Sequence, residues 1–476
     1  MSRFPLSAAP QTPATPSWAD LLSGPNLLRS IALTGGVALH AINVHIVTTI
    51  LPSVVRDIGG LEYYAWNITL FVVTSILGST LTAKMLDVVS ARSAYLAALL
   101  MFTLGSVICA TAPEMGWMLA GRSVQGLGGG LLAGLSYALI RIVFAPPLWS
   151  RAVALVSGMW GVATLFGPAV GGLFAESGNW RMAFWVLLPV SAAQALIVLL
   201  QLRGVAKSGT GQVRVPVLKI ILLALSVLSV ALAGQFEQTG AKLAGVACGL
   251  AFGMLVARLD QRPGVQLLPT GAYRLDSVMG KVFACVCLLM IGTTTEIFVP
   301  YFLQTIHGYT PLLAGYMTAA MAGGWSIASL LSSGRADGGA DRMVRLGPLL
   351  MTVSLAALAV LLPLQDGMPV PVHSVLLAVT LAGVGLGVGL GWPHLLTRVM
   401  KVAVAGEENL AASAITTVQL YAMAIGAALA GLVANAAGLT APGGVAGAQV
   451  AAMSLFGLFA LAPVLAILLT RGITRS

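Results

Sequence analysis

Two ionisable residues lie within long apolar stretches of the sequence, where a charge is costly. Glu296 follows three threonines and precedes Pro300 by four residues, and Arg122 lies in a glycine-rich run that also contains Gln125. Apolar surroundings favour the neutral form of a carboxylic acid, so Glu296 is suited to take up and release a proton. We expect Glu296 to carry a proton or to be the counter-charge of a cationic substrate. A salt bridge between Arg122 and Glu296 is the alternative.

The composition is that of an integral membrane protein. Hydrophobic residues make up 58% of the chain and charged residues only 8%, whereas soluble domains carry about 25% charged residues. Such a chain cannot present a water-soluble surface, so we expect it to lie in a lipid bilayer. We expect the four cysteines to act as small apolar residues in packed helices, and we expect no metal, cofactor or nucleic-acid partner. The cysteines are Cys109, Cys248, Cys285 and Cys287.

Apolar runs of about 17 to 25 residues are long enough to cross the bilayer core as helices. Fourteen such runs are present, and they group as six, two and six. They lie at 28–52, 63–86, 93–112, 115–143, 150–175, 181–202, 216–234, 242–258, 278–303, 309–333, 343–363, 374–396, 410–436 and 446–470.

The grouping predicts an all-α polytopic membrane protein with two six-helix bundles. We expect the bundles at 28–202 and 278–470, joined by a linker at 203–277 that carries two extra transmembrane helices. Residues 1–27 contain five prolines and are expected to form a largely disordered cytoplasmic tail. Residues 471–476 are expected to form a second cytoplasmic tail.

The positions of the basic residues predict the orientation. With a cytoplasmic amino terminus, 21 of the 25 lysines and arginines fall on the cytoplasmic side, as the positive-inside rule requires. Three fall outside, namely Arg56, Arg181 and Lys242, and Arg122 lies within a span. Both termini are therefore predicted to be cytoplasmic. The net charge of +10 follows from this topology and needs no anionic partner.

The segment from Ala41 to Pro52 resembles the first-helix signature of the fourteen-helix drug:proton antiporters of the major facilitator superfamily. That signature reads roughly Leu-Asp-x-Thr-Ile-Val-Asn-Val-Ala-Leu-Pro. The aspartate of the family falls on Asn43 here and its threonine falls on His45. The resemblance implies the major facilitator fold, with 14 transmembrane helices arranged 6+2+6. The residues that match are Ile46, Val47, Leu51 and Pro52.

The departure at Asn43 bears on the coupling ion, because asparagine cannot titrate. Either the proton is carried elsewhere or transport is not driven by protons. Two histidines on the same helix, His40 and His45, titrate near neutral pH, and His45 is the candidate to replace the missing aspartate. The alternative for each histidine is a hydrogen bond to a neighbouring helix.

Two further segments resemble helix motifs of the same superfamily. The run from Gly121 to Gly130 is similar to the fourth-helix motif Arg-x-x-Gln-Gly-x-Gly, which implies that Arg122 interacts with first-helix polar groups and assists proton coupling. The alternative is that the long side chain of Arg122 reaches the headgroups. The run from Gly158 to Arg181 is similar to the antiporter signature, in which small residues let helices pack closely around a proline kink. Its motif residues are Gly167, Pro168, Gly171 and Gly172.

The loop at 83–92 resembles the superfamily motif Gly-x-Leu-x-Asp-Arg-x-Gly-Arg-Arg, with Asp87 and Arg92 in matching positions. The resemblance implies that Asp87 pairs with a neighbouring helix end and latches the cytoplasmic side. A poorer copy lies at 334–342, which is what internal duplication of a six-helix unit predicts. The segment 301–315 is also similar to spans nine and ten of the same family.

Aromatic and amide residues at membrane depth are candidates to line a cavity for a flat apolar ligand. The alternative for each is simple packing or anchoring at the membrane interface. These candidates are Trp66, Asn67, Gln125, Trp160, Tyr301, Tyr316, Gln419 and Tyr421.

The resemblance implies a secondary transporter of the bacterial inner membrane. It is expected to be a monomer that exports small hydrophobic or amphipathic, drug-like compounds by proton antiport, with Glu296, Arg122, His45 and Asn43 in the coupling site. An uncoupled facilitator or a specific metabolite exporter on the same fold is the alternative. A non-transporting sensor and a membrane enzyme are remote alternatives. An enzyme would need clustered catalytic groups, and the candidates are too scattered: His373, His394, Glu407 and Glu408.

Overall fold

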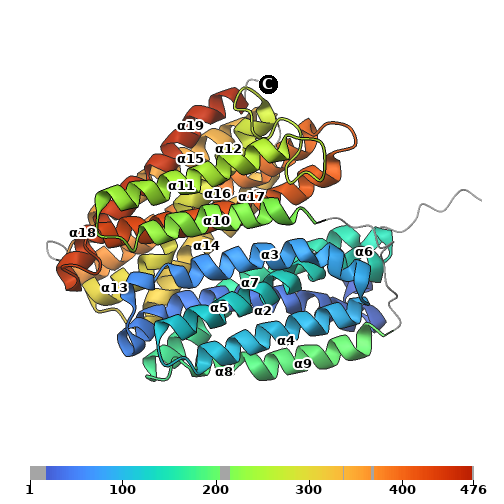
Figure 1. The fold of residues 1–476 in the computed structure, drawn as a ribbon, viewed down its shortest axis with the longest axis horizontal. Coiled ribbons are helices and arrows are strands. Elements are labelled where there is room, and N and C mark those ends of the chain that lie inside the picture. The colour runs from blue at the N-terminus through green and yellow to red at the C-terminus, as the bar shows by residue number, and fades with distance from the viewer. Residues whose placement is uncertain (1–17, 204–214, 336, 366–368, 474–476) are drawn as a thin grey trace, which may run out of the picture.

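The structure is a computed structural model that describes residues 18–203, 215–335, 337–365 and 369–473 (Figure 1). Every regular element within these ranges is a helix. The expected amino-terminal tail lies largely outside the described residues, except for a short helix, α1, and the start of α2. The last helix continues to Ile473, so only 474–476 of the expected carboxy-terminal tail lie outside.

The first half of the chain forms α1 (Trp18–Leu21), α2 (Gly24–Ile58), η1 (Leu61–Tyr63), α3 (Trp66–Val88), α4 (Ala91–Ala110), α5 (Met115–Ala138), α6 (Ile140–Val143), η2 (Pro146–Leu148), α7 (Trp149–Glu176), α8 (Met182–Trp185) and α9 (Leu187–Gln201). The second half forms α10 (Val217–Ala233), α11 (Thr239–Asp260), α12 (Val278–Thr293), η3 (Thr294–Phe298), α13 (Val299–His307), α14 (Pro311–Ser333), α15 (Asp337–Leu361), α16 (Val370–Val402), α17 (Glu408–Ala436), α18 (Gly444–Phe459) and α19 (Leu461–Ile473).

Within the described residues, 11 helical segments are long and apolar enough to cross a membrane. Each coincides with one of the expected runs. The other three runs coincide with the helices α5, α10 and α14, which are not among the 11. Helix α10 has only 17 residues, and glycine and polar side chains make α5 and α14 less apolar than a typical span.

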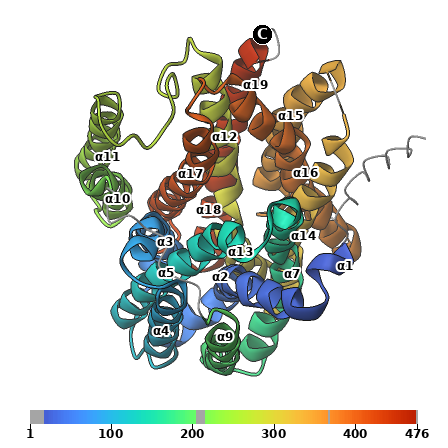
Figure 2. The same ribbon diagram turned by 90° about the vertical axis from the view of Figure 1, so that its right-hand side faces the viewer.

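The helices lie roughly along one long axis and form two groups (Figure 1). Helices α2 to α9 pack together in one group, and α12 to α19 pack together in the other. Figure 2 shows α10 and α11 at the periphery, beside α3 and α17. We call the end with the turn from α13 to α14 the α13 end, and the opposite end, which carries α6, the α6 end.

Glycine allows helices of the second group to touch through their backbones. A Cβ atom added to Gly385 of α16 would lie 1.7 Å from the carbonyl oxygen of Met321 in α14. A Cβ atom at Gly389 would lie 2.3 Å from the carbonyl oxygen of Trp325. Small residues are favoured at such contacts in a membrane, because packing and not the hydrophobic effect holds the helices together.

The glycines of helix α7 differ along its length in how closely they pack against neighbouring helices. Gly167 and Gly171 pack against α2, and a Cβ atom at Gly172 would lie 2.5 Å from Leu312 of α14. By contrast, a Cβ atom at Gly158 or Gly161 would have no neighbour within 4 Å. The glycines in the half of α7 nearer the α13 end therefore pack closely against neighbouring helices, whereas Gly158 and Gly161 in the other half face open space.

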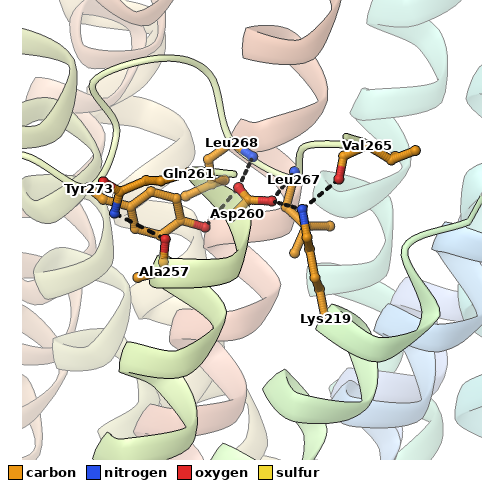
Figure 3. Close-up of polar contacts among 8 residues, drawn as sticks. All are labelled: Lys219, Ala257, Asp260, Gln261, Val265, Leu267, Leu268 and Tyr273. Atoms are coloured by element: carbon orange, nitrogen blue, oxygen red, sulfur yellow. Dashed lines mark hydrogen bonds and ion pairs between the residues drawn. The ribbon is translucent and has the colours of Figure 1, made fainter. Parts of the chain in front are cut away.

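A buried aspartate holds the loop that follows the α10–α11 pair (Figure 3). The carboxylate of Asp260 is 2.8 Å from the Lys219 ammonium and accepts hydrogen bonds from the backbone N–H groups of Leu267 and Leu268. It also accepts one from the hydroxyl of Tyr273 at 3.0 Å. Burial and the neighbouring carboxylate raise the pKa of Tyr273 well above its usual value, so the phenol stays a donor.

The same loop is tied to the second group of helices. Thr270 donates from its backbone N–H and its hydroxyl to the two carboxylate oxygens of Glu407, just before α17. Farther along, the hydroxyls of Ser226 in α10 and Tyr421 in α17 lie 2.9 Å apart. These contacts attach α10 and α11 to the second group, the first near the α6 end and the second midway along α10 and α17.

We predict that Asp260→Asn lowers the free energy of unfolding by about 3 kcal/mol, because it leaves the largely buried Lys219 ammonium without its counter-charge. Thermal unfolding in detergent measures the effect. Asp276→Asn in the same loop is the matched control. Asp276 is exposed, and its hydrogen bond from Arg274 lowers its pKa, but a surface pair contributes little to stability. Equal loss in both variants would contradict this role of Asp260.

Candidate functional site

A cavity of about 230 Å³ lies between the two groups of helices. Helices α2, α3, α5 and α7 form one side, and α12, η3 and α17 form the other. Its lining is mainly apolar with a few polar groups, which is the usual character of a pocket for a small organic ligand. The polar and aromatic side chains that face it include His40, Phe71, Ser75, Tyr137, Trp160, Thr294, Glu296 and Gln419.

Glu296 lies where the helical hydrogen-bond pattern breaks. The 3₁₀ segment η3 separates α12 from α13, and Pro300 explains the break, because proline has no N–H to donate to the carbonyl of Glu296 four residues earlier. That carbonyl instead accepts from the N–H of Val299, three residues on. A break of this kind within a span is typical of a functional site.

The three threonines before Glu296 stabilise this break. The hydroxyl of Thr293 donates to the carbonyl of Met290 at 2.7 Å, and that of Thr294 donates to the carbonyl of Ile291 at 2.6 Å. Thr295 does the same with the carbonyl of Gly292 at 3.1 Å. In an apolar medium a disrupted turn needs such side-chain partners, because no water is available to replace the lost hydrogen bonds.

The Glu296 carboxylate faces the cavity without a partner. It is half-buried, and among the described residues no hydrogen bond or ion pair reaches it. It is also the only acidic side chain among the described residues that line the cavity. The carboxylate is therefore free to bind a proton or a cationic group.

Arg122 is fully buried but does not line the cavity. Its Nε donates to the backbone carbonyl of Asn67 at 3.1 Å, and Nη1 donates to the side-chain oxygen of Gln125. Its guanidinium carbon lies 4.0 Å from the ring centre of Phe71, which does line the cavity. Among the described residues, Arg122 forms no ion pair, so the alternative of a salt bridge with Glu296 is absent from this structure.

The two histidines of α2 face different neighbours. His40 lines the cavity and stacks on Phe71, with 5.2 Å between the ring centres. His45, the histidine expected at the coupling site, is half-buried against α7, where a Cβ atom at Gly167 would lie 2.3 Å from its own Cβ. The structure therefore brings His40, and not His45, to the cavity.

The eight residues expected to form the cavity are distributed over several places. Trp160 and Gln419 line it together with Glu296. Tyr316 is 42% exposed on the surface of α14. The hydroxyl of Tyr421 meets Ser226 of α10, away from the cavity.

The other four lie nearer the α13 end or behind the cavity wall. Asn67 and Gln125 surround Arg122, and Gln125 is held in place by donating to the Ser106 hydroxyl at 2.8 Å. Trp66 is half-buried at the start of α3, beside residues of α10 and α17. Tyr301 packs on Tyr64 at 5.5 Å between ring centres.

Aromatic and polar contacts close the gap between the two groups at the α13 end. Tyr64 stacks on Phe298 with 5.0 Å between ring centres. The carboxylate of Glu176, at the end of α7, accepts a hydrogen bond from the backbone N–H of Leu312 in the first turn of α14, where a negative charge is favoured by the helix dipole. These contacts separate the cavity from the α13 end.

The cavity is open toward the α6 end. Two of its lining residues, Tyr137 and Trp160, are each 39% exposed. The neighbouring glycines of α7, Gly158 and Gly161, have no close neighbours there. A ligand therefore has access from the α6 end and not from the α13 end.

The two loop motifs form ion pairs in this structure. Asp87 is buried and lies 3.4 Å from the ammonium of Lys84 in the preceding turn, and Arg92 is half-buried at the start of α4. In the second half of the chain, Asp341 of α15 pairs with Arg398 of α16. The expected copy at 334–342 lies partly outside the described residues, because Ala336 is not described.

Sequence reasoning missed part of the cavity lining. Phe71 and Ser75 carry no charge and fall in an ordinary apolar run, so their residue types gave no signal. The three successive threonines before a glutamate and a proline were the one local signal, since they mark a helix interruption with its own hydrogen-bond partners.

Comparison with known proteins identifies the family. The family model described as Major Facilitator Superfamily matches residues 33–427. The chain belongs to the major facilitator superfamily. It is 40% identical over 467 residues to a probable multidrug-efflux transporter of Mycobacterium tuberculosis (strain H37Rv), covering 95% of this chain and 96% of that protein. It is 25% identical over 396 residues to a multidrug transporter of Bacillus subtilis (strain 168), covering 80% and 70% of the two chains.

Solved structures of the superfamily share the fold. The peptide transporter POT in complex with sulfate gives a TM-score of 0.68 at 14% identity, covering 97% of both chains. A bacterial homologue of the human lysosomal transporter Spinster gives a TM-score of 0.65 at 14% identity, covering 95% of this chain and 98% of the other. The homologues are transporters and not enzymes, so the membrane-enzyme alternative falls away.

We predict that a cysteine in the cavity wall is reached by a water-soluble reagent and that a buried one is not. Thr416 is exposed and lines the cavity, whereas Thr69 is fully buried. In a cysteine-free background, Thr416→Cys should react with a charged maleimide in detergent at least about ten times faster than Thr69→Cys. Equal reactivity would mean that the cavity is closed or that α3 is loosely packed.

Proposed function

We propose that this chain exports small hydrophobic or amphipathic, drug-like compounds from a bacterial cytoplasm in exchange for protons. The proposal rests above all on the unpaired Glu296 carboxylate, which faces a largely apolar cavity between two helical bundles. It is supported by the 40% identity to a probable multidrug-efflux transporter over nearly the full length of both chains. The apolar lining suits a flat organic compound, and the single carboxylate suits a proton or a cationic group.

We propose that the chain crosses the bacterial inner membrane fourteen times, as a monomer, with bundles at 28–202 and 278–470. The 11 apolar segments and α5, α10 and α14 then make the spans, in the order six, two and six. The excess of lysine and arginine supports a cytoplasmic location for the α6 end and both termini. The cavity of this structure then opens toward the cytoplasm, the side from which an exporter loads its substrate.

The transport cycle follows from the chemistry of one carboxylate. In the conformation open to the cytoplasm, loss of the proton from Glu296 leaves a negative charge that binds an amphipathic cation. In the conformation open to the outside, a proton from the medium neutralises Glu296, and the substrate loses its counter-charge and leaves. Proton and substrate exclude each other at the carboxylate, and that exclusion couples their opposite movements.

Arg122 acts on this site from a distance. It is separated from the cavity by Phe71 and held by Asn67 and Gln125. On the resemblance to the antiporter family, Arg122 assists proton coupling at the site, and Phe71 connects its guanidinium to the cavity. Asn43, like Arg122, lies behind the cavity wall. His45, at the contact between α2 and α7, is a second titratable group in this part of the protein.

An uncoupled facilitator or a specific metabolite exporter is the second candidate. The observation that favours it is Asn43, which cannot titrate where the resembling family has an aspartate. On this alternative Glu296 binds a polar group of one substrate and does not exchange a proton during transport.

We predict that Glu296→Gln abolishes the stimulation of efflux by a pH gradient, since the amide cannot exchange a proton. The assay measures ethidium efflux from proteoliposomes with and without an imposed gradient. Native protein should respond to the gradient by about tenfold, and the variant by less than about twofold. Glu237→Gln, an exposed acid between α10 and α11, is the matched control and should retain the native response.

Two outcomes would count against the proposal. A native response in Glu296→Gln would remove this carboxylate from the coupling mechanism. Efflux by the native protein that ignores the gradient, at measurable rate, would favour the uncoupled facilitator.

A further inference from the structure

Behind the cavity wall lies a second polar region, and the proposed transport cycle does not explain its unsatisfied hydrogen-bonding groups. Its central residues are Arg122 of α5 and Asn43 of α2, and the side chains of both are 0% exposed. Neither lines the cavity. A buried ion is normally stabilised by an opposite charge, because neutral dipoles replace its lost hydration only in part.

All the groups that contact the Arg122 guanidinium are uncharged. Its Nε and Nη1 donate to the carbonyl of Asn67 and the side-chain oxygen of Gln125, and the face of Phe71 covers the guanidinium. Its third nitrogen, Nη2, is buried without a hydrogen-bond partner among the described residues. No carboxylate in the described part of the chain lies within 4.0 Å of it.

Asn43 has no partner for either of its polar side-chain atoms within the described residues. Its position follows from the packing of α2 on α5. A Cβ atom at Gly36 would lie 2.7 Å from Ser136, and one at Gly129 would lie 2.7 Å from His40. The two helices run in opposite directions, and Asn43 shares a helix face with Gly36, seven residues earlier.

This register places Asn43 within about one helical turn of Arg122 along the α2–α5 contact. The rings of His40 and Phe71 stack, and the Arg122 guanidinium packs on the same Phe71 ring. Asn43 lies one turn beyond His40 toward the α13 end, which is also the direction of Arg122 along α5. The amide N–H of Asn43 and the Nη2 of Arg122 therefore supply unused donors to the same interior region.

We propose that this region binds a small monovalent anion, with chloride as the representative ion. The charge of Arg122 attracts it, and the amide of Asn43 and Nη2 of Arg122 donate hydrogen bonds to it. The anion neutralises the one buried cation that lacks an acidic partner among the described residues, and it is distinct from the transported compound, because Phe71 and His40 lie between this region and the cavity. The inference does not require proton exchange at Glu296, but Arg122 takes part in both proposals.

The native protein provides the first test. Thermal unfolding in detergent is followed by tryptophan fluorescence while chloride replaces gluconate at constant sodium concentration and ionic strength. The unfolding temperature should rise with chloride, by about 3 °C between about 1 mM and about 100 mM, because a ligand that binds only the folded state stabilises it. An unfolding temperature that is independent of chloride would overturn the proposal. The amide of Asn43 and Nη2 of Arg122 would then be assigned to hydrogen bonds with water.

Two variants then assign the site. Asn43→Asp supplies a carboxylate beside Arg122, and Arg122→Gln removes the cation, so each should lose the dependence on chloride. Asn179→Asp, which adds the same charge at an exposed turn, should keep it. Should one buried variant fail to fold, the other decides. Chloride dependence that persists in a folded Asn43→Asp or Arg122→Gln protein would place the anion elsewhere and contradict the proposal.

Discussion

An apolar medium offers no partner to a broken helix or an unpaired charge, and this constraint governs the whole molecule. In agreement with this constraint, every element of regular secondary structure in the described residues is a helix. Where the helix is interrupted at Glu296, hydroxyls of Thr293 and Thr294 bond to the carbonyls of the preceding turn. The interruption is tolerated because it faces a cavity, and it leaves one carboxylate without a partner at the boundary between the two helical groups.

The glycines of α7 pack closely against other helices near the α13 end and face open space toward the α6 end. Gly172 touches α14 near the α13 end, whereas Gly158 of the same helix has no close neighbour. One glycine-rich helix therefore carries both the contact that closes one side and the free surface that leaves the other side accessible. Because glycine has no side chain to rearrange, a helix of this composition can lose its close contacts at one end and form them at the other.

The sequence predicted the helices well because apolar length is a strong signal, and the loops between them are polar. It did not predict which face of a helix points inward, since the lipid-facing and buried faces of a span are both apolar. His40 and His45 illustrate this, because a difference of five residues turns one toward the cavity and the other toward α7. Tyr316 and Tyr421, expected at the cavity, do not line it for the same reason. Glu296 was selected because a carboxylate within a span is rare, and it does line the cavity.

The central claim is that Glu296 binds either a proton or an amphipathic cation, and a count of released protons tests it most directly. Tetraphenylphosphonium is added to purified protein in weakly buffered detergent solution, and the proton release is followed with an indicator dye. The account predicts that the native protein releases protons on binding, up to about one per bound cation, and that Glu296→Gln releases none while still folded. Binding without proton release across the neutral pH range, or equal release by the variant, would contradict it.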